Sequence, residues 1–217
     1  MEEPDTKTRL LDAAEDLFGR LGIAETSLRA ITTEAGTNLA AVNYHFGSKE
    51  ALVEQTFMRR LAPLNRERLR MLDEAEASSG DAPSALEDLV RAFVGPTLRL
   101  RYQSQHGDSF LRLMGRLYMG PPDFVLRIMA QFDEAFQRFS HAFGRAMPGI
   151  AATELNWRIF FLIGSMTFPL VASEVIQHRT GGLCDSKDVE AQIDRLVSFI
   201  SGGLKAPGTD PDRGQTQ

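Results

Sequence analysis

The sequence predicts an all-α protein, and three observations support this fold class. Apolar residues recur at spacings of three and four along most of the chain, which is the period of an amphipathic helix. Turns rich in glycine, proline or small polar residues separate the helical stretches. No stretch alternates polar and apolar residues as a half-buried strand does. The front third holds short helices, and the remainder holds longer ones.

The composition restricts the compartment and the class of protein. The chain has 217 residues, of which 43% are hydrophobic, enough for one large or two small cores. It has one cysteine, Cys184, so an intrachain disulfide and a cysteine metal cluster are both excluded. The longest apolar stretch, 159–175, is interrupted by glycine, serine, threonine and proline. We therefore expect a cytoplasmic protein without a membrane span.

Four short helices are predicted at the front of the chain. The first covers 6–21 and ends at Gly22, where a residue without a side chain suits a helix stop. Thr26 or Ser27 caps the second, and Asn38 caps the third after a turn at Gly36. Their inward residues recur at helical spacing: Leu10, Ala14, Leu17, Phe18 and Leu21, then Leu28, Ile31 and Ala35, then Val42 and Phe46. The fourth helix runs from 49 to about 61, and Pro63 is expected to bend it.

The rest of the chain reads as longer helices. A polar stretch at 73–84 predicts a linker or an exposed loop. Helices are then expected at 85–101, 110–119, 123–145, 153–178 and 185–200, with breaks at 103–109, 120–122 and 180–182. Residues 205–217 are expected to form a disordered tail.

The third helix differs from an ordinary core or surface helix. GTNLAAVNYHFGSK, residues 36–49, contains alanines, two amides, a tyrosine and a histidine, with almost no charge. Val42 and Phe46 lie one turn apart and hold the helix on the core. The opposite side then carries small or polar residues, which suits a surface that lies against something other than water.

The segment TSLRAITTEAGTNLAAVNYHFGSKEALVEQTF resembles the DNA-binding segment of the TetR family of transcriptional regulators. The resemblance extends back to TRLLDAAEDLFGRLG, covers about the first 57 residues and agrees in the spacing of every element. NLAAVNYHFGSKEAL is similar to PsrA-type members in particular, and FLRLMGRLYMG and LNWRIFFLIGSMTF look like that subgroup less specifically.

The resemblance implies an all-α homodimer whose N-terminal three-helix helix-turn-helix domain, residues 1–50, binds a pseudo-palindromic double-stranded DNA operator. It implies a larger C-terminal domain, residues 51–204, that dimerises and binds a small apolar effector which releases the DNA. The subgroup is similar to regulators of lipid metabolism, which makes an acyl chain or acyl-CoA the first expectation and an aromatic or drug-like compound the alternative. Two residues depart from the family's commonest motif: Asn43 replaces a tyrosine, and Leu39 replaces a lysine or small polar residue.

The third helix supplies most of the predicted DNA contacts. Leu39 and Ala40 suit thymine methyl groups, and Asn43 suits the paired N6 and N7 atoms of adenine. Tyr44, His45 and Lys49 suit phosphates, which position a protein without specifying sequence. The full predicted set is Ser27, Arg29, Asn38, Leu39, Ala40, Asn43, Tyr44, His45 and Lys49. The alternative for Tyr44 and His45 is that they only cover the edge of the domain.

The front of the chain is not basic. Residues 1–60 contain 7 Lys or Arg and 10 Asp or Glu, a net charge of 7 − 10 = −3. This argues against strong non-specific DNA affinity but leaves specific binding open, because the placement of charge matters more than its sum.

An apolar effector site is predicted in the larger domain. Its expected lining is Phe110, Met114, Arg116, Phe132, Phe136, Trp157, Phe160 and Phe161. Arg112 and Arg116, one turn apart, suit a carboxylate or phosphate head group. The alternatives are a phenylalanine stripe that is simply core and two arginines on a solvated face.

The last two long helices are predicted to form a two-fold interface. The expected contacts are Ile163, Gly164, Thr167, Val171, Ile193, Leu196, Val197 and Ile200, with intrachain packing as the alternative. The histidines lack ligand spacing, so we expect no metal, and no phosphate loop or catalytic constellation indicates a cofactor or an enzyme. Besides a DNA-binding regulator and an enzyme, a helical ligand-binding module that has lost DNA binding is a further interpretation of the sequence.

Overall fold

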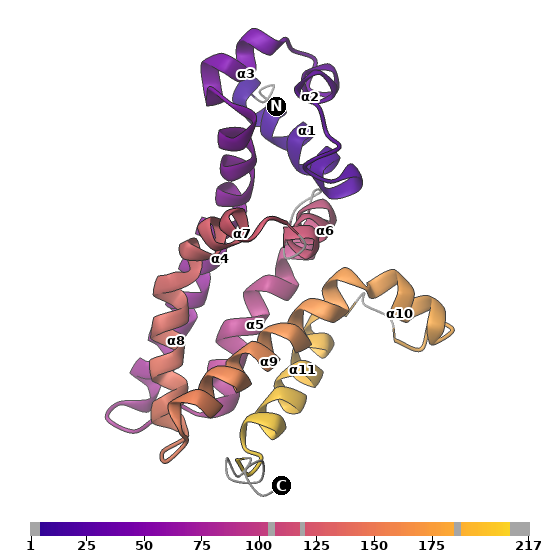
Figure 1. Ribbon diagram of the computed structural model, residues 1–217. Coiled ribbons are helices and arrows are strands. Elements are labelled where there is room, and N and C mark those ends of the chain that lie inside the picture. Colours follow the sequence, from indigo (N-terminus) through magenta and orange to yellow (C-terminus); the bar gives the residue numbers. More distant parts are fainter. Residues whose placement is uncertain (1–4, 104–106, 118–119, 185–187, 209–217) are drawn as a thin grey trace, which may run out of the picture. The chain divides into compact units, whose positions relative to one another are not determined.

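The computed structural model describes residues 5–103, 107–117, 120–184 and 188–208 (Figure 1). It confirms the all-α fold class, and no strand occurs in these four ranges. The elements are α1 Thr6–Leu21, α2 Leu28–Glu34, α3 Leu39–Phe46, α4 Lys49–Ser79, α5 Leu86–Gln103, α6 Gly107–Leu117, α7 Pro122–Met129, the 3₁₀ turn η1 Ala130–Phe132, α8 Asp133–Ala146, α9 Ala152–Val171, α10 Ser173–Arg179 and α11 Val189–Leu204. The chain divides into two compact units.

The first unit contains residues up to 66 together with 99–133. Its core joins the front helices to α6 and α7: Leu10 and Phe18 of α1, Ile31, Val42, Phe57 and Phe110 are all buried. The ring of Phe57 lies edge-on to the rings of Phe110, at 6.3 Å, and Phe124, at 6.1 Å. The unit is therefore larger than the predicted domain 1–50, because residues distant in sequence complete its core.

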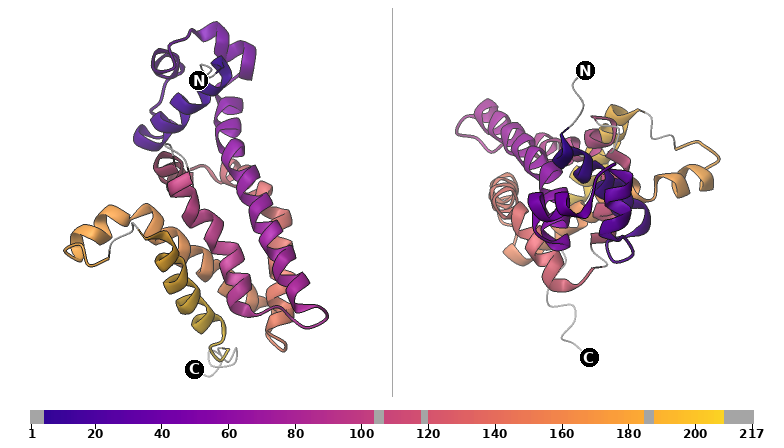
Figure 2. Two further views of the ribbon diagram at one scale, coloured as in Figure 1. Left: turned by 180° about the vertical axis from the view of Figure 1, so that it is seen from behind. Right: turned by 90° about the horizontal axis from the view of Figure 1, so that it is seen from above.

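The second unit contains residues 67–98 and those after 133. Buried phenylalanines form its centre, with the rings of Phe93 and Phe139 5.0 Å apart and Phe143 fully buried beside Phe139. Helices α9 and α11 pack side by side, as both views in Figure 2 show. Three of the predicted interface residues, Ile193, Val197 and Ile200, are buried inside this unit and pack within the chain.

The polar stretch 73–84 is mostly helical, which corrects the loop prediction. Helix α4 continues to Ser79, and only the residues that follow it form the turn. Alanine and glutamate favour helix, and Arg138 of α8 pairs with Asp73 at 2.7 Å and Glu76 at 2.9 Å. Tertiary contacts therefore extend a helix whose composition alone resembles a linker.

Two long predicted helices are interrupted. The predicted helix 123–145 is divided into α7, η1 and α8, so that Phe132 belongs to the first unit and Phe136 to the second. The predicted helix 153–178 is divided into α9 and α10, which are bent by 72°. Pro169 lies just before this bend, where proline removes a backbone donor.

Helix α11 ends later in the chain than the sequence predicts. Asp188 caps α11 by accepting a hydrogen bond from the N–H of Ala191, while residue 185, where the sequence predicts that this helix begins, lies outside the described residues. Helix α11 ends at Leu204, and Lys205 pairs with Glu87 of α5. Most of the predicted tail, 209–217, is likewise outside the described residues. Over the described part of the chain, no single helix is long and apolar enough to cross a membrane, and only the bent pair α9 and α10 together meets that length and composition.

Candidate nucleic-acid interface and effector-binding unit

The helix-turn-helix is built from two capped helices and a tight turn. The side chain of Ser27 accepts a hydrogen bond from the N–H of Ala30, and that of Asn38 accepts one from the N–H of Ala41, each at 3.1 Å. Gly36 has a φ of 61° in the turn, a conformation that favours glycine. These caps fix where α2 and α3 begin, and both helices pack against α1 (Figure 1).

Helix α3 has a buried side and an exposed side, as the sequence predicts. Val42 is fully buried and Phe46 is 7% exposed. On the other side, Leu39, Ala40 and Asn43 are exposed. Tyr44 is 86% exposed. A helix with small, polar and aromatic side chains facing outward can enter a DNA major groove closely.

The other predicted DNA contacts come from α2, from the caps of α2 and α3, from α3 itself and from the start of α4. His45 is half-buried, and its ring lies 5.0 Å from that of Tyr44. The Nζ of Lys49 lies 3.5 Å from the carbonyl oxygen of Ala24, and Arg29 is exposed. The caps occupy the side-chain oxygens of Ser27 and Asn38, so these two residues shape the motif as well as bordering it.

Ion pairs neutralise much of the acidic charge of α1. Glu15 is fully buried, and its carboxylate accepts hydrogen bonds from Arg59 at 2.8 Å and Arg60 at 3.0 Å. Asp12 also pairs with Arg59, and Asp16 pairs with Arg20. These pairs leave the net charge of residues 1–60 unchanged, but they hold three of its acids against arginines of α1 and α4. Sequence reasoning did not find the Glu15 cluster, although an acid among the apolar positions of α1 is a signal for one.

The N-terminus of α1 carries a further cap. The side chain of Asp5 accepts a hydrogen bond from the N–H of Thr8 at 2.7 Å. This backbone hydrogen bond is the main cause that lowers the pKa of Asp5 from its ordinary value. Lys7 lies over the ring of Phe46 at 5.9 Å, which joins the start of α1 to the end of α3.

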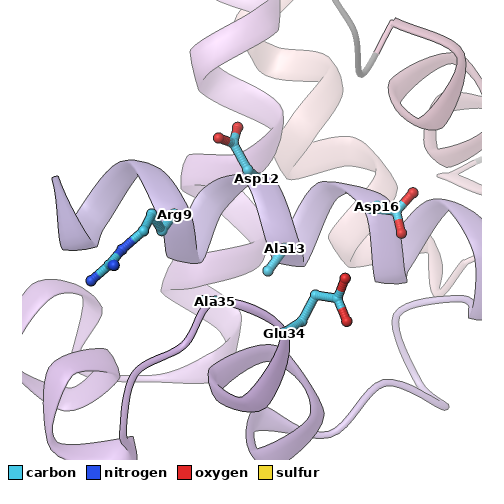
Figure 3. Close-up of a pocket in the computed structure, with 6 residues that line it drawn as sticks. All are labelled: Arg9, Asp12, Ala13, Asp16, Glu34 and Ala35. Carbon is cyan, nitrogen blue, oxygen red and sulfur yellow. The ribbon is translucent and has the colours of Figure 1, made fainter. Parts of the chain in front are cut away.

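An open pocket lies beside α1 in the first unit (Figure 3). Its lining is Arg9, Asp12, Ala13, Asp16, Glu34 and Ala35. In Figure 3 the side chains of Asp12 and Glu34 project on opposite sides of α1, which does not suit a shared cation. Among the described residues, no group of three or more His, Cys, Asp or Glu has a geometry that could hold a metal ion.

The predicted effector lining is divided between the two units. Phe110 is buried in the core of the first unit, with Met114 and Phe132 packed against that core. Arg116, also in the first unit, donates hydrogen bonds to the carbonyl oxygens of Gly19 and Arg20. The remaining four residues belong to the second unit: Phe136, Trp157, Phe160 and Phe161.

In the second unit, the aromatic residues of α9 are exposed. Trp157 and Phe160 are each 58% exposed, and Phe161 and Phe168 are each 63% exposed. With Gly164 and Val171 they recur at spacings of three and four and form one apolar stripe, which we call the α9 stripe. The rings of Trp157 and Phe161 stack at 5.8 Å, and Phe160 lies 6.0 Å from Phe136 of α8.

A buried cation lies in the interior of the second unit. Arg68 of α4 is 4% exposed and donates hydrogen bonds to the carbonyl oxygen of Phe93 at 2.9 Å and the hydroxyl of Thr97 at 2.7 Å. Its guanidinium lies over the ring of Phe93, 4.4 Å from the centroid. Sequence reasoning missed Arg68, because its position in a stretch rich in charged residues resembles a solvated helix face.

Models of two bacterial regulator domains match most of the chain. Residues 10–56 match the bacterial regulatory proteins of the tetR family, and residues 91–203 match the tetracyclin repressor-like C-terminal domain. The protein belongs to the TetR family. Regulators of this family are DNA-binding transcription regulators and not enzymes.

A curated relative and several solved structures agree with this assignment. The nicotine-responsive transcriptional repressor HdnoR of Paenarthrobacter nicotinovorans is 36% identical over 103 residues, which are 48% of this chain and 53% of the relative. The match thus spans about half the length of that relative. A TetR-family regulator from Bordetella parapertussis has a TM-score of 0.67 at 17% identity, covering 91% of this chain and 95% of that one. SmeT, the repressor of the SmeDEF multidrug efflux pump of Stenotrophomonas maltophilia, has a TM-score of 0.62 at 21% identity, covering 96% of each chain. Similarity to these two structures shows the shared fold.

Proposed function

We propose that this TetR-family regulator is a repressor that binds a pseudo-palindromic operator as a homodimer and is released by a small apolar effector. The observation that carries the proposal is the exposed side of α3, where small, polar and aromatic residues lie above a fully buried Val42. Residues 1–50, the helix-turn-helix domain expected from the sequence, would bind DNA. Residues 51–204 would bind the effector and form the dimer.

Base reading is assigned to three residues of α3. Leu39 and Ala40 would contact thymine methyl groups, and Asn43 would pair with adenine. Because Asn43 and Leu39 depart from the family's commonest motif, the preferred operator would differ from those of better-known members.

Phosphate contact is assigned to the surrounding residues. Phosphates would be contacted by Tyr44 and His45 of α3, by Arg29 of α2 and by Lys49 at the start of α4. The N-termini capped by Ser27 and Asn38 present backbone N–H groups that suit phosphate as well. These contacts would fix the register of the protein on DNA and would leave sequence choice to the bases that α3 reads.

Homodimer formation is supported by the α9 stripe. A contiguous row of exposed aromatic residues on a soluble domain marks a surface that is covered in the working assembly. Phe199 of the neighbouring α11 is 71% exposed and is followed by exposed Gly202 and Gly203, which allow close approach of a partner. The interface would therefore use the aromatic residues of α9 rather than the aliphatic residues of α11.

The effector is proposed to be an amphipathic molecule such as a fatty acid or acyl-CoA. Buried phenylalanines, among them Phe93, Phe139 and Phe143, form the interior of the second unit, which supports an apolar chain. The resemblance to PsrA-type regulators points the same way. An aromatic or drug-like compound is the second candidate, and it is favoured by the similarity to a nicotine-responsive repressor.

The test is fluorescence anisotropy with a labelled duplex from the DNA upstream of the protein's own gene, at moderate salt and with non-specific competitor. Binding that resists competitor is expected, followed by release on addition of palmitoyl-CoA or oleate. Release by nicotine alone would replace the acyl effector with the second candidate. Failure of the folded dimer to bind the duplex would contradict the repressor proposal and favour a ligand-binding module without DNA binding.

A further inference from the structure

Helices α1 and α6 approach each other unusually closely within the first unit. A Cβ atom placed on Gly19 would lie 2.5 Å from the carbonyl oxygen of Ser109 and 3.1 Å from its carbonyl carbon. Both contacts are with backbone atoms, which cannot move aside as the end of a flexible side chain can. Residue 19 is therefore restricted to glycine by the backbone of α6.

Polar contacts flank this close approach. The hydroxyl of Ser109 donates to the carboxylate of Asp16 at 3.0 Å. On the other side, Arg116 donates through Nε to the carbonyl oxygen of Gly19 at 3.2 Å and through Nη2 to that of Arg20 at 3.0 Å. We call Asp16, Gly19, Ser109 and Arg116 the α1–α6 latch.

The Arg116 contacts complete the C-terminal end of α1. The last four carbonyl groups of a helix lack partners within the helix, and a cation there also interacts favourably with the helix dipole. Helix α1 ends at Leu21, so Gly19 and Arg20 belong to its last turn. An arginine of α6 therefore supplies a cap that α1 does not supply for itself.

Helix α1 also carries the helix-turn-helix. Its apolar side, with Leu10, Ala14 and Phe18, forms one core with Ile31 of α2 and Val42 of α3. Since α1 contacts α6 through the latch and α2 and α3 through this core, its placement sets the position of the reading helix.

We propose that Arg116, with Ser109 and Gly19, is a positioning residue for operator binding. It acts through α1 and does not contact the effector or the DNA. The proposal rests on the operator binding proposed above and extends it, because α6 lies in the segment that matches the C-terminal domain family, 91–203, yet belongs to the first unit. The α1–α6 latch therefore joins a helix of the segment 91–203 to α1, the helix on which α2 and α3 pack.

The experiment compares full-length Arg116→Ala with the wild-type protein on the same labelled duplex, with no effector present. Loss of two charge-assisted hydrogen bonds is expected to weaken operator binding by roughly tenfold. Arg116→Lys, which still donates to carbonyl groups, should recover most of the affinity. Arg127→Ala, which removes another exposed arginine of the first unit, is the matched control and should change affinity less than twofold.

Two readouts separate positioning from a phosphate contact and from simple destabilisation. The slope of log affinity against log salt should not change, whereas loss of a phosphate contact lowers it by about one. Stoichiometric titration should show the wild-type fraction of active protein, whereas partial unfolding would lower that fraction. Gly19→Ala, which separates the helices and keeps every charge, should reproduce the loss of affinity.

Hydrogen exchange distinguishes failure of this proposal from failure of the proposed function, because it needs no DNA. Backbone amides of residues 36–46 should exchange faster in Arg116→Ala than in the wild type. Wild-type exchange in this segment, or wild-type operator affinity of the variant, would overturn the latch proposal. Absence of operator binding by the wild-type protein would overturn only the function on which it rests.

Discussion

The exposed sides of α3 and α9 both carry few charged residues, but they differ in chemistry. Helix α3 presents Ala40, Asn43 and Tyr44 above a core that is complete within the first unit. Helix α9 presents Trp157 and Phe161 above the core of the second unit. Small and polar groups suit base edges and phosphates, while contiguous aromatic groups suit another protein surface. The difference indicates which helix meets DNA and which meets a partner chain.

The largest loss of stability in the first unit is expected from a substitution in its buried ion pair. Glu15→Gln should lower the free energy of unfolding by about 3 kcal/mol, the low end for a broken buried pair. The low end applies because the side chains of Arg59 and Arg60 are 19% and 20% exposed. Chemical denaturation measures the effect, and Glu34→Gln, an exposed acid of α2, should change it by less than about 0.5 kcal/mol. Equal stability of the two variants would show that the Glu15 cluster does not hold α1 on α4.

Substitutions in the α9 stripe are expected to weaken the dimer more than substitutions elsewhere on the surface of the second unit. Trp157→Glu and Phe161→Glu each remove an aromatic side chain whose burial contributes about 1.5–3 kcal/mol, twice in a symmetric dimer. Each variant should raise the dimer dissociation constant about a hundredfold or more, as sedimentation equilibrium would show. Asn156→Glu adds the same charge beside the stripe and should remain dimeric. A dimeric Trp157→Glu, Phe161→Glu double variant would exclude the stripe as the interface.

The roles assigned to the exposed side of α3 can be tested by comparing a predicted base contact with a predicted phosphate contact. Asn43→Ala should weaken operator binding by about tenfold, corresponding to one bidentate base contact, and leave non-specific DNA binding unchanged. Tyr44→Phe should weaken both by a similar few-fold factor, because a phosphate is present at every sequence. Competition anisotropy with operator and scrambled duplexes gives both values. Equal losses for the two variants would contradict the division of roles on α3.

The smallest effect is expected at an exposed ion pair of the second unit. A hydrogen bond from Lys205 is the main cause that lowers the pKa of Glu87. Since the folded-state pKa is depressed, the stabilisation is present above the unfolded-state pKa and is lost as the pH falls through the folded-state value. Glu87→Gln should cost at most about 0.5 kcal/mol at neutral pH, because the side chains of Glu87 and Lys205 are 48% and 57% exposed.

The pH dependence of thermal unfolding tests this pair. The difference between wild type and Glu87→Gln should shrink as the pH falls through the lowered pKa. Lys205→Met should produce the same small loss at neutral pH, and the double variant should lose no more than either single variant. Additive losses would mean that the two residues do not act as a pair.

The sequence by itself determined the all-α class, the first three helices and the exposed side of α3. These features depend on local signals: caps at Ser27 and Asn38, a turn at Gly36, and helical spacing of Val42 and Phe46. Such signals act between residues a few positions apart, so they can be read directly along the chain.

The tertiary structure decided what the longer helices pack against. Arg116, Trp157 and Phe136 share helical spacing and apolar surroundings, yet one caps α1, one is exposed and one is half-buried. Periodicity shows that a residue lies on one side of a helix but does not show what covers that side. The assignment of α6 to the reading head, and of the α9 stripe to the surface, depends on contacts between residues far apart in the sequence, which only the folded chain brings together.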